Sequence, residues 1–324
     1  MSENFKKLFK KKINKQARMI FSFQAAVFLA MLGYMIFKII YLRSTTGLTD
    51  TIINELSGSF IESGIPIILG LFLGMIVVLF HRKSKLFTYD LLVQNKKMTL
   101  KNFLKLFLCF MFVQAIFTVG ATGIENLFNL FGYTLMEGME SATETSIMFS
   151  MFIYASILGP ITEEIVFRGA LLRGLEKYGK LFAIIVSAVL FGAFHSNLIQ
   201  GIFTTLAGLL LGYVAIEYSI KWAIVFHIIN NLVLGDILGS ILSYFSLGTQ
   251  SIINYILLIL AFFGGIFVLF KSWGSIKKYI RENKSDRTLY QYTFTSFWVV
   301  LYISINVLLS IFSITKITEI IKTL

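Results

Sequence analysis

Hydrophobic runs of about twenty residues recur along the whole chain, and short polar segments separate them. Within each run the apolar residues are continuous and do not alternate with polar ones, which predicts helices and argues against a transmembrane barrel. We therefore expect an all-α fold, a polytopic bundle of about eight or nine transmembrane helices. The expected spans cover residues 19–41, 65–80, 104–121, 147–173, 181–195, 201–217, 222–238, 251–270 and 293–314.

Most basic residues are gathered into four blocks between these spans, at residues 1–18, 81–105, 168–180 and 271–287. When the spans are counted in order, all four blocks fall on one side of the membrane. Because Lys and Arg accumulate in cytoplasmic loops, this side is predicted to be the cytoplasm, and the N-terminus is predicted to lie there.

The composition supports a membrane protein and limits its partners. The chain of 324 residues is 56% hydrophobic and 14% charged, whereas soluble proteins are roughly 25% charged. Its net charge of +12 would suit a nucleic acid, but the basic residues lie between spans and not on one face, so we expect no nucleic-acid partner. The basic cytoplasmic surface is instead expected to attract anionic lipid. The single cysteine, Cys109, excludes an internal disulfide.

Ionisable side chains inside the expected spans are the candidates for chemistry, because each costs roughly 2.5–3.5 kcal/mol at the centre of a membrane helix. A buried ion pair alone could serve only to fix helix packing, and a single histidine could do the same. Two acids, a guanidinium, two imidazoles and an amide on three helices favour a functional site instead. This set comprises Glu163, Glu164, Arg168, His195, His227 and Asn231.

The spacing of the acids indicates which side chains meet. Glu164 and Arg168 are four residues apart, so on a helix the guanidinium can hold the carboxylate in place. Glu163 points about 100° away and is free to face a cavity.

Two backbone features are expected to shape this region. Pro160 precedes the acids and should kink or restart the helix, because it removes a backbone hydrogen bond. Gly208 and Gly212, four residues apart, should permit a close contact between two helices.

Three short motifs follow one another along this part of the chain. They read EExxxR from Glu163 to Arg168, FxxxH from Phe191 to His195, and HxxxN from His227 to Asn231. In this order within one membrane domain, they resemble the motifs of the CAAX-processing and bacteriocin-processing intramembrane endopeptidases, which include the type II CAAX prenyl endopeptidase. The resemblance covers about residues 145–235. We therefore divide the chain into an N-terminal transmembrane region (1–144), a catalytic core (145–240) and a C-terminal transmembrane region (241–324).

The resemblance implies hydrolysis of a peptide bond inside the membrane, in a site that activates water and stabilises an oxyanion. It implies that Glu163 and His195 activate the water, and that Glu164, paired with Arg168, orients the site. A carboxylate buried in this way suits a general base that works near neutral pH.

By the same resemblance, His227 and Asn231 would polarise the carbonyl group and hold the oxyanion, while Phe191 would pack against the site without taking part in the chemistry. The cofactor stays open at this point. A zinc ion could be held near Glu163, His195 and His227, and a water activated by Glu and His without a metal is equally consistent with the residues.

The resemblance also implies a substrate and a location. The substrate would be a membrane-associated peptide or protein tail near the cytoplasmic leaflet, and the membrane would be that of a bacterial cell. Prenylated CAAX tails are the best-known substrates of the family, whereas its bacterial members are linked to peptide maturation or to bacteriocin immunity.

Two other classes of protein stay open. A proton-coupled transporter also uses acids and histidines, but it would favour inverted repeats, and the polar residues here lie in one block. A non-proteolytic membrane scaffold or immunity protein could retain the fold and its motifs. An intramembrane aspartyl protease is disfavoured, because Asp90 lies in a basic loop and Asp236 lacks the GxGD pattern.

Overall fold

The computed structural model describes residues 2–46, 63–135 and 148–316. Nearly all of this is helical, and the expected all-α polytopic bundle is confirmed. Seven of the described helices are long and apolar enough to cross a membrane, or eight if one bent pair counts as a single span. Two-residue strands β1 (Tyr133–Thr134) and β2 (Thr315–Lys316) pair antiparallel, with Tyr133 opposite Lys316.

The elements fall into three groups that follow the predicted division of the chain. The N-terminal helices are α1 (Glu3–Thr46), α3 (Ile65–Arg82), η1 (Leu86–Asp90) and α4 (Leu100–Asn129). The central elements are α6 (Phe149–Ile153), η2 (Tyr154–Leu158), α7 (Gly159–Glu164), η3 (Ile165–Leu172), α8 (Arg173–Leu175), η4 (Glu176–Tyr178), α9 (Lys180–Phe194), α10 (Leu198–Glu217), α11 (Ile220–Ile228), η5 (Ile229–Ile237) and α12 (Leu238–Leu242). The C-terminal helices are α13 (Leu247–Asn283), α14 (Arg287–Phe294) and α15 (Phe297–Phe312).

All nine expected spans are helices in the structure, but two of them are not straightforward spans. The fifth is α9, which has 15 residues and falls short of the length needed to cross a membrane alone. It can be short because it is surrounded by protein, and most of its residues are buried. The last expected span is the bent pair α14 and α15, whose axes differ by 64°.

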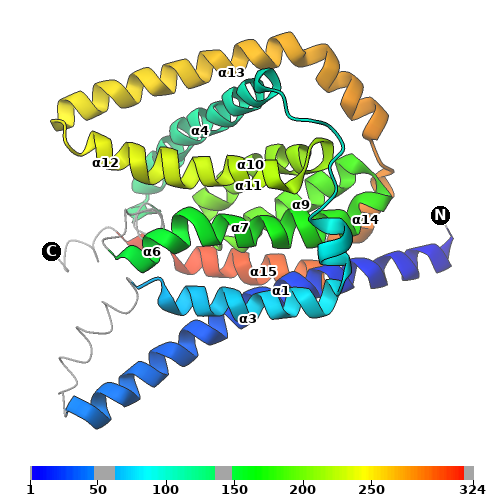
Figure 1. Cartoon of the computed structure of the whole chain (residues 1–324), viewed down its shortest axis with the longest axis horizontal. Coiled ribbons are helices and arrows are strands. Elements are labelled where there is room, and N and C mark those ends of the chain that lie inside the picture. The colour runs from blue at the N-terminus through cyan, green and yellow to red at the C-terminus, as the bar shows by residue number, and fades with distance from the viewer. Residues whose placement is uncertain (1, 47–62, 136–147, 317–324) are drawn as a thin grey trace.

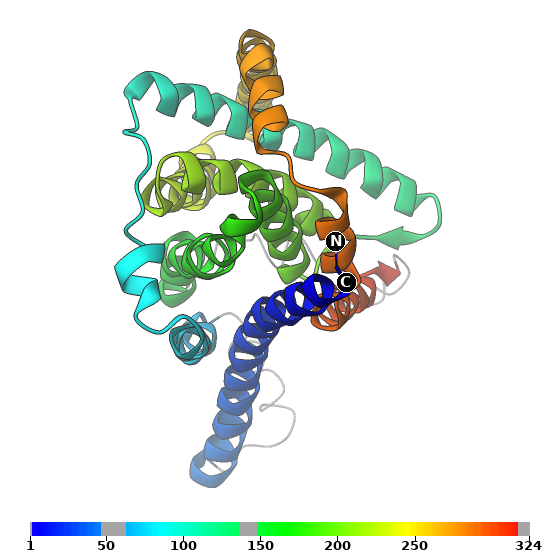
Figure 2. The same ribbon diagram turned by 90° about the vertical axis from the view of Figure 1, so that its right-hand side faces the viewer.

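The central elements lie between two layers of flanking helices (Figure 1). On one side α13 packs against α4, and on the other α1 packs against α3 (Figures 1 and 2). The second half of α1 projects beyond the rest of the bundle (Figure 2). The central elements, which carry the candidate residues, are therefore shielded on both sides by the two transmembrane regions.

The four basic blocks meet at one end of the bundle. Lys12 of α1 and Lys177 of η4 line the same cavity. Ser285, from the last basic block, donates a hydrogen bond to the backbone oxygen of Tyr178 at 3.0 Å. The predicted arrangement of the blocks on one side is thus confirmed, while the assignment of that side to the cytoplasm stays a prediction.

The glycines of α10 bring this helix close to α9, as the sequence predicted. A Cβ atom at Gly208 would lie 3.2 Å from Cα of Ala188, and one at Gly212 would lie 3.3 Å from Cγ2 of Ile184. Both distances are tight, so the absence of a side chain allows this contact between the two helices.

Candidate active site

The two adjacent acids lie on a continuous helical run of residues 149–178. Within this run the hydrogen bonding changes from π-helical in η2 to α-helical in α7, where Pro160 occupies the first turn, and back to π-helical in η3. The helix thus restarts in register beside Pro160 without a break. Single π-helical turns are rare and are frequent at functional sites.

Glu164 is the centre of a buried ionic cluster. Its Oε1 atom lies 3.1 Å from Nη1 of Arg168 and 2.9 Å from Nδ1 of His227. The side chains of Glu164 and Arg168 are fully buried, and His227 is 8% exposed. The predicted pairing of Glu164 with Arg168 is present, and His227 joins it from a helix 63 residues further along the chain.

Glu163 faces the other side of the same imidazole. Its Oε2 atom lies 3.8 Å from Nε2 of His227, and its side chain is 14% exposed whereas that of Glu164 is not exposed at all. The two adjacent acids therefore differ as their helical positions predicted. One is locked in an ion pair, and the other can reach a small molecule such as water.

The hydrogen bonds of the two histidines select their tautomers. Nδ1 of His195 lies 3.0 Å from the backbone oxygen of Phe191, which can only accept, so this nitrogen carries a proton. Nδ1 of His227 faces the carboxylate of Glu164 and donates in the same way. In both neutral rings the Nε2 atom is then left with a free lone pair.

Phe191 contacts three members of the site. Its ring is edge-on to the ring of His195, with centroids 4.9 Å apart, and to that of His227, with centroids 6.0 Å apart. The guanidinium carbon of Arg168 lies 4.1 Å from its centroid, within cation–π distance. Phe191 thus takes the packing position that the motif predicted, and it connects His195 to the ionic cluster.

Asn231 lies one helical turn beyond His227 and is held at both ends of its amide. Its Nδ2 atom donates to the backbone oxygen of Ala155 at 2.9 Å, and its Oδ1 atom accepts from Nδ2 of Asn230 at 2.9 Å. Gln114 of α4 donates in turn to Asn230. One N–H of the Asn231 amide is left for a ligand.

A second polar network, which the motifs did not reveal, fixes the end of α9 beside His195. Oδ1 of Asn306 accepts from Nε2 of Gln24 at 2.8 Å and from Oγ of Ser196 at 2.6 Å. Gln24 also donates to the backbone oxygen of Phe194 at 3.2 Å. Ser196 has a φ of 49°, a left-handed conformation that costs energy outside glycine and that these bonds can maintain.

This network joins the two flanking regions to the candidate site, since Gln24 belongs to α1 and Asn306 to α15. A signal for it was present in the sequence. Both amides interrupt long apolar runs, and a polar side chain inside a membrane helix is expected to find a partner.

The residues present do not form a ligand set for zinc. Among the described residues, no group of three or more His, Cys, Asp or Glu side chains is arranged to hold a metal ion. Glu164 and Nδ1 of His227 already bind each other, which leaves Glu163 and Nε2 of His227 as one pair of donors. We therefore derive the chemistry of the site from the acids and imidazoles of the chain.

Comparisons with known proteins point to the same segment. Residues 145–233 match the family model described as type II CAAX prenyl endopeptidase Rce1-like. Over 77 residues the chain is 35% identical to the protein of Bacillus subtilis (strain 168) named "Putative membrane peptidase YdiL". This alignment covers 24% of the present chain and 32% of that relative. No solved structure matches the chain significantly.

The resemblance predicted from the three motifs is thereby confirmed for the central region. At the level of the family, this region is similar to the CAAX-type membrane proteases. Together with its apolar helices, the match identifies the chain as an integral membrane protein.

Proposed function

We propose that this protein is an intramembrane endopeptidase that hydrolyses a peptide bond in a membrane-proximal peptide or protein tail. The observation that carries the proposal is the placement of His227 between two carboxylates, 2.9 Å from Glu164 and 3.8 Å from Glu163. The family match over residues 145–233 supports the same reaction class.

Charge balance assigns the starting state. Glu163, Glu164 and Arg168 together carry one net negative charge, which is costly at a buried site. One further proton, shared by His227 and Glu163, makes the cluster neutral. In the active form His227 holds this proton, and Glu163 is a carboxylate that can act as a base.

Hydrolysis then follows from the positions of these groups. A water molecule between Glu163 and Nε2 of His195 loses a proton to Glu163 as its oxygen attacks the carbonyl carbon. The Nε2–H of His227 and the free N–H of Asn231 donate to the oxyanion that develops. Collapse of the tetrahedral intermediate breaks the C–N bond, and Glu163 returns its proton to the leaving amine.

Glu164 and Arg168 act through His227. Glu164 accepts from Nδ1 and so holds the ring with Nε2 toward Glu163, in the way that a buried acid orients the histidine of a catalytic triad. Arg168 keeps Glu164 ionised and is itself held over the ring of Phe191.

The experiment uses the purified full-length protein in nanodiscs with quenched fluorescent peptides whose C-terminal segment is apolar, made with and without an isoprenyl group on a cysteine. The wild type is expected to cleave at least one peptide, and Glu163→Gln should lower the rate by about 10²–10⁴-fold, the usual contribution of a general base. Equal cleavage by both proteins would refute the proposed role of Glu163. The same assay with a chelator present should leave the rate unchanged.

A further inference from the structure

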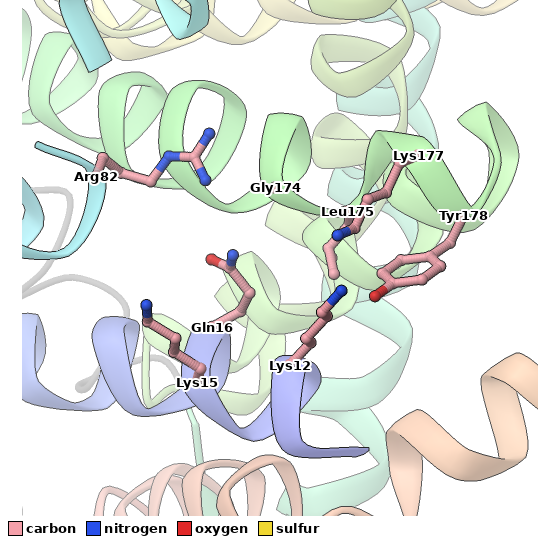
Figure 3. Close-up of a pocket in the computed structure, with 8 residues that line it drawn as sticks. All are labelled: Lys12, Lys15, Gln16, Arg82, Gly174, Leu175, Lys177 and Tyr178. Atoms are coloured by element: carbon pink, nitrogen blue, oxygen red, sulfur yellow. The ribbon is translucent and has the colours of Figure 1, made fainter. Parts of the chain in front are cut away.

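A cavity of about 190 Å³ opens at the end of the bundle where the basic blocks meet. It lies between the first turns of α1, the last turn of α3 and the segment that follows the candidate site (Figure 3). Since one water molecule takes up about 30 Å³, the cavity has room for a group larger than a few waters. It is lined by Lys12, Lys15, Gln16, Arg82, Gly174, Leu175, Lys177 and Tyr178.

The lining is strongly cationic. In the described part of the chain, no carboxylate lies within ion-pair distance of Lys12, Lys15 or Lys177. Arg82 is the exception, because Nε and Nη2 bind the buried carboxylate of Asp90 at 2.7 and 2.5 Å. Four cations and one carboxylate leave a net charge of +3 on one small cavity, and charges of one sign held together attract an anion.

The cations also point into a shared space. The ammonium groups of Lys12 and Lys177 approach each other from opposite walls, and the hydroxyl group of Tyr178 points between them (Figure 3). Lysines whose only task is to set membrane orientation would instead extend separately into water. This convergence distinguishes the cavity from a merely basic surface.

Two features show that the walls are fixed in place. The ring of Tyr178 packs edge-on against Phe9 at 4.8 Å and Phe182 at 6.1 Å. A Cβ atom at Gly174 would lie 2.5 Å from Nε2 of Gln16, so only glycine lets this amide lie against the helix. Oε1 of Gln16 is buried without a hydrogen-bond partner, and it can accept from a hydroxyl group of a ligand.

We propose that this cavity binds a phosphate group, contributed by the headgroup of an anionic phospholipid or by a soluble phosphate. A phosphate offers the negative charge and the acceptor oxygens that the lysines and the tyrosine lack, and a glycerol headgroup adds hydroxyl donors for Gln16. The lipid is the source favoured by position, because the cavity lies at the end of the membrane helices. Gly174 follows Glu164 by ten residues, about 15 Å of helix, so a bound phosphate would tie α1 and α3 to the helix that carries the candidate site.

The test measures binding and does not depend on peptidase activity. The purified full-length protein is titrated with phosphatidylglycerol by native mass spectrometry, and in a second arm with inorganic phosphate and glycerol 1-phosphate by thermal shift. The double variant Lys12→Gln/Lys177→Gln is compared with Lys11→Gln/Lys97→Gln, which removes the same charge outside the cavity. A charge-preserving variant, Lys12→Arg/Lys177→Arg, controls for folding.

The cavity variant is expected to bind at least tenfold more weakly than the wild type, while the matched control and the arginine variant stay within about threefold. Binding of phosphatidylglycerol alone would identify a lipid headgroup, and equal binding of glycerol 1-phosphate would identify a soluble ligand. An equal loss in both glutamine variants would show diffuse attraction to a basic surface and would overturn the proposal, as would the absence of saturable binding in the wild type.

Discussion

Nδ1 of His227 lies 2.9 Å from Oε1 of Glu164, and this contact joins two helices that are 63 residues apart in the chain. The same oxygen is the ionic partner of Arg168, whose guanidinium is fully buried. One carboxylate thus orients an imidazole and neutralises a buried cation at the same time.

The first prediction follows from this double role. Glu164→Ala leaves Arg168 buried without its partner, so it should lower the free energy of unfolding by about 3–5 kcal/mol. Glu163→Ala removes a partly exposed acid that makes no contact shorter than 3.8 Å to His227, and it should cost less than about 1 kcal/mol. Reversible unfolding in mixed micelles measures both, and equal losses would contradict the assignment of the two acids.

The pairing of Glu164 with Arg168 could be predicted from the sequence because the helical period alone places residues four apart on one face. The contact between Glu164 and His227 could not, because it depends on how α11 packs against the site helix. For the same reason the sequence placed Glu163 with His195, whereas the structure records its approach to His227 at 3.8 Å.

The second prediction concerns the space beside Arg168. A Cβ atom at Gly208 would lie 3.1 Å from Nη2 of Arg168 and 3.2 Å from Cα of Ala188, so Gly208→Ala should destabilise the protein by about 1–3 kcal/mol. The matched control is Gly123→Ala on α4, where nothing lies within 4 Å of the added atom. Thermal unfolding of the two variants in the same detergent measures the difference. A control that is as destabilised as Gly208→Ala would show that helix propensity, and not packing, decides.

The third prediction tests whether the flanking helices position His195. Asn306→Ala removes the acceptor shared by Gln24 and Ser196, so the end of α9 should loosen and the ring signals of His195 should shift and broaden. The chain has three histidines, which makes their ring nitrogens resolvable by NMR of selectively labelled protein.

His81 should keep its signal in this experiment, and Asn254→Ala, at an exposed position on α13, should leave all three rings unchanged. If Asn306→Ala left the His195 signal in place while lowering stability, the network would have only a structural role.

The fourth prediction concerns the basic face. Glu217 is 2% exposed and binds Lys96 at 2.5 Å, Lys180 at 2.8 Å and the hydroxyl group of Tyr279 at 3.1 Å. Glu217→Ala should therefore cost about 1.5–3 kcal/mol, the usual range for hydrogen bonds to a charged group. Lys97→Ala, at an exposed neighbouring position, should cost less than about 0.5 kcal/mol, and chemical denaturation compares the two. A similar cost for both would show that Glu217 does not join these elements.

The sequence predicted the nine helical segments well because long apolar runs leave the chain few alternatives in a membrane. It could not show that α9 is enclosed by other helices, since its apolar residues would suit lipid and protein equally. The convergence of Lys12, Arg82 and Lys177 on one cavity was also hidden, because the positive-inside pattern predicts a side of the membrane and not a contact.

The central claim is that Glu163 and His227 act on a peptide bond, and the most direct measurement detects new peptide termini whatever the substrate is. Membranes that contain equal amounts of the wild type or of Glu163→Gln are compared by mass spectrometry of protein and peptide termini. The account predicts a set of termini near membrane segments that forms with the wild type and is absent with the variant. Identical sets of termini from the two membranes would contradict it.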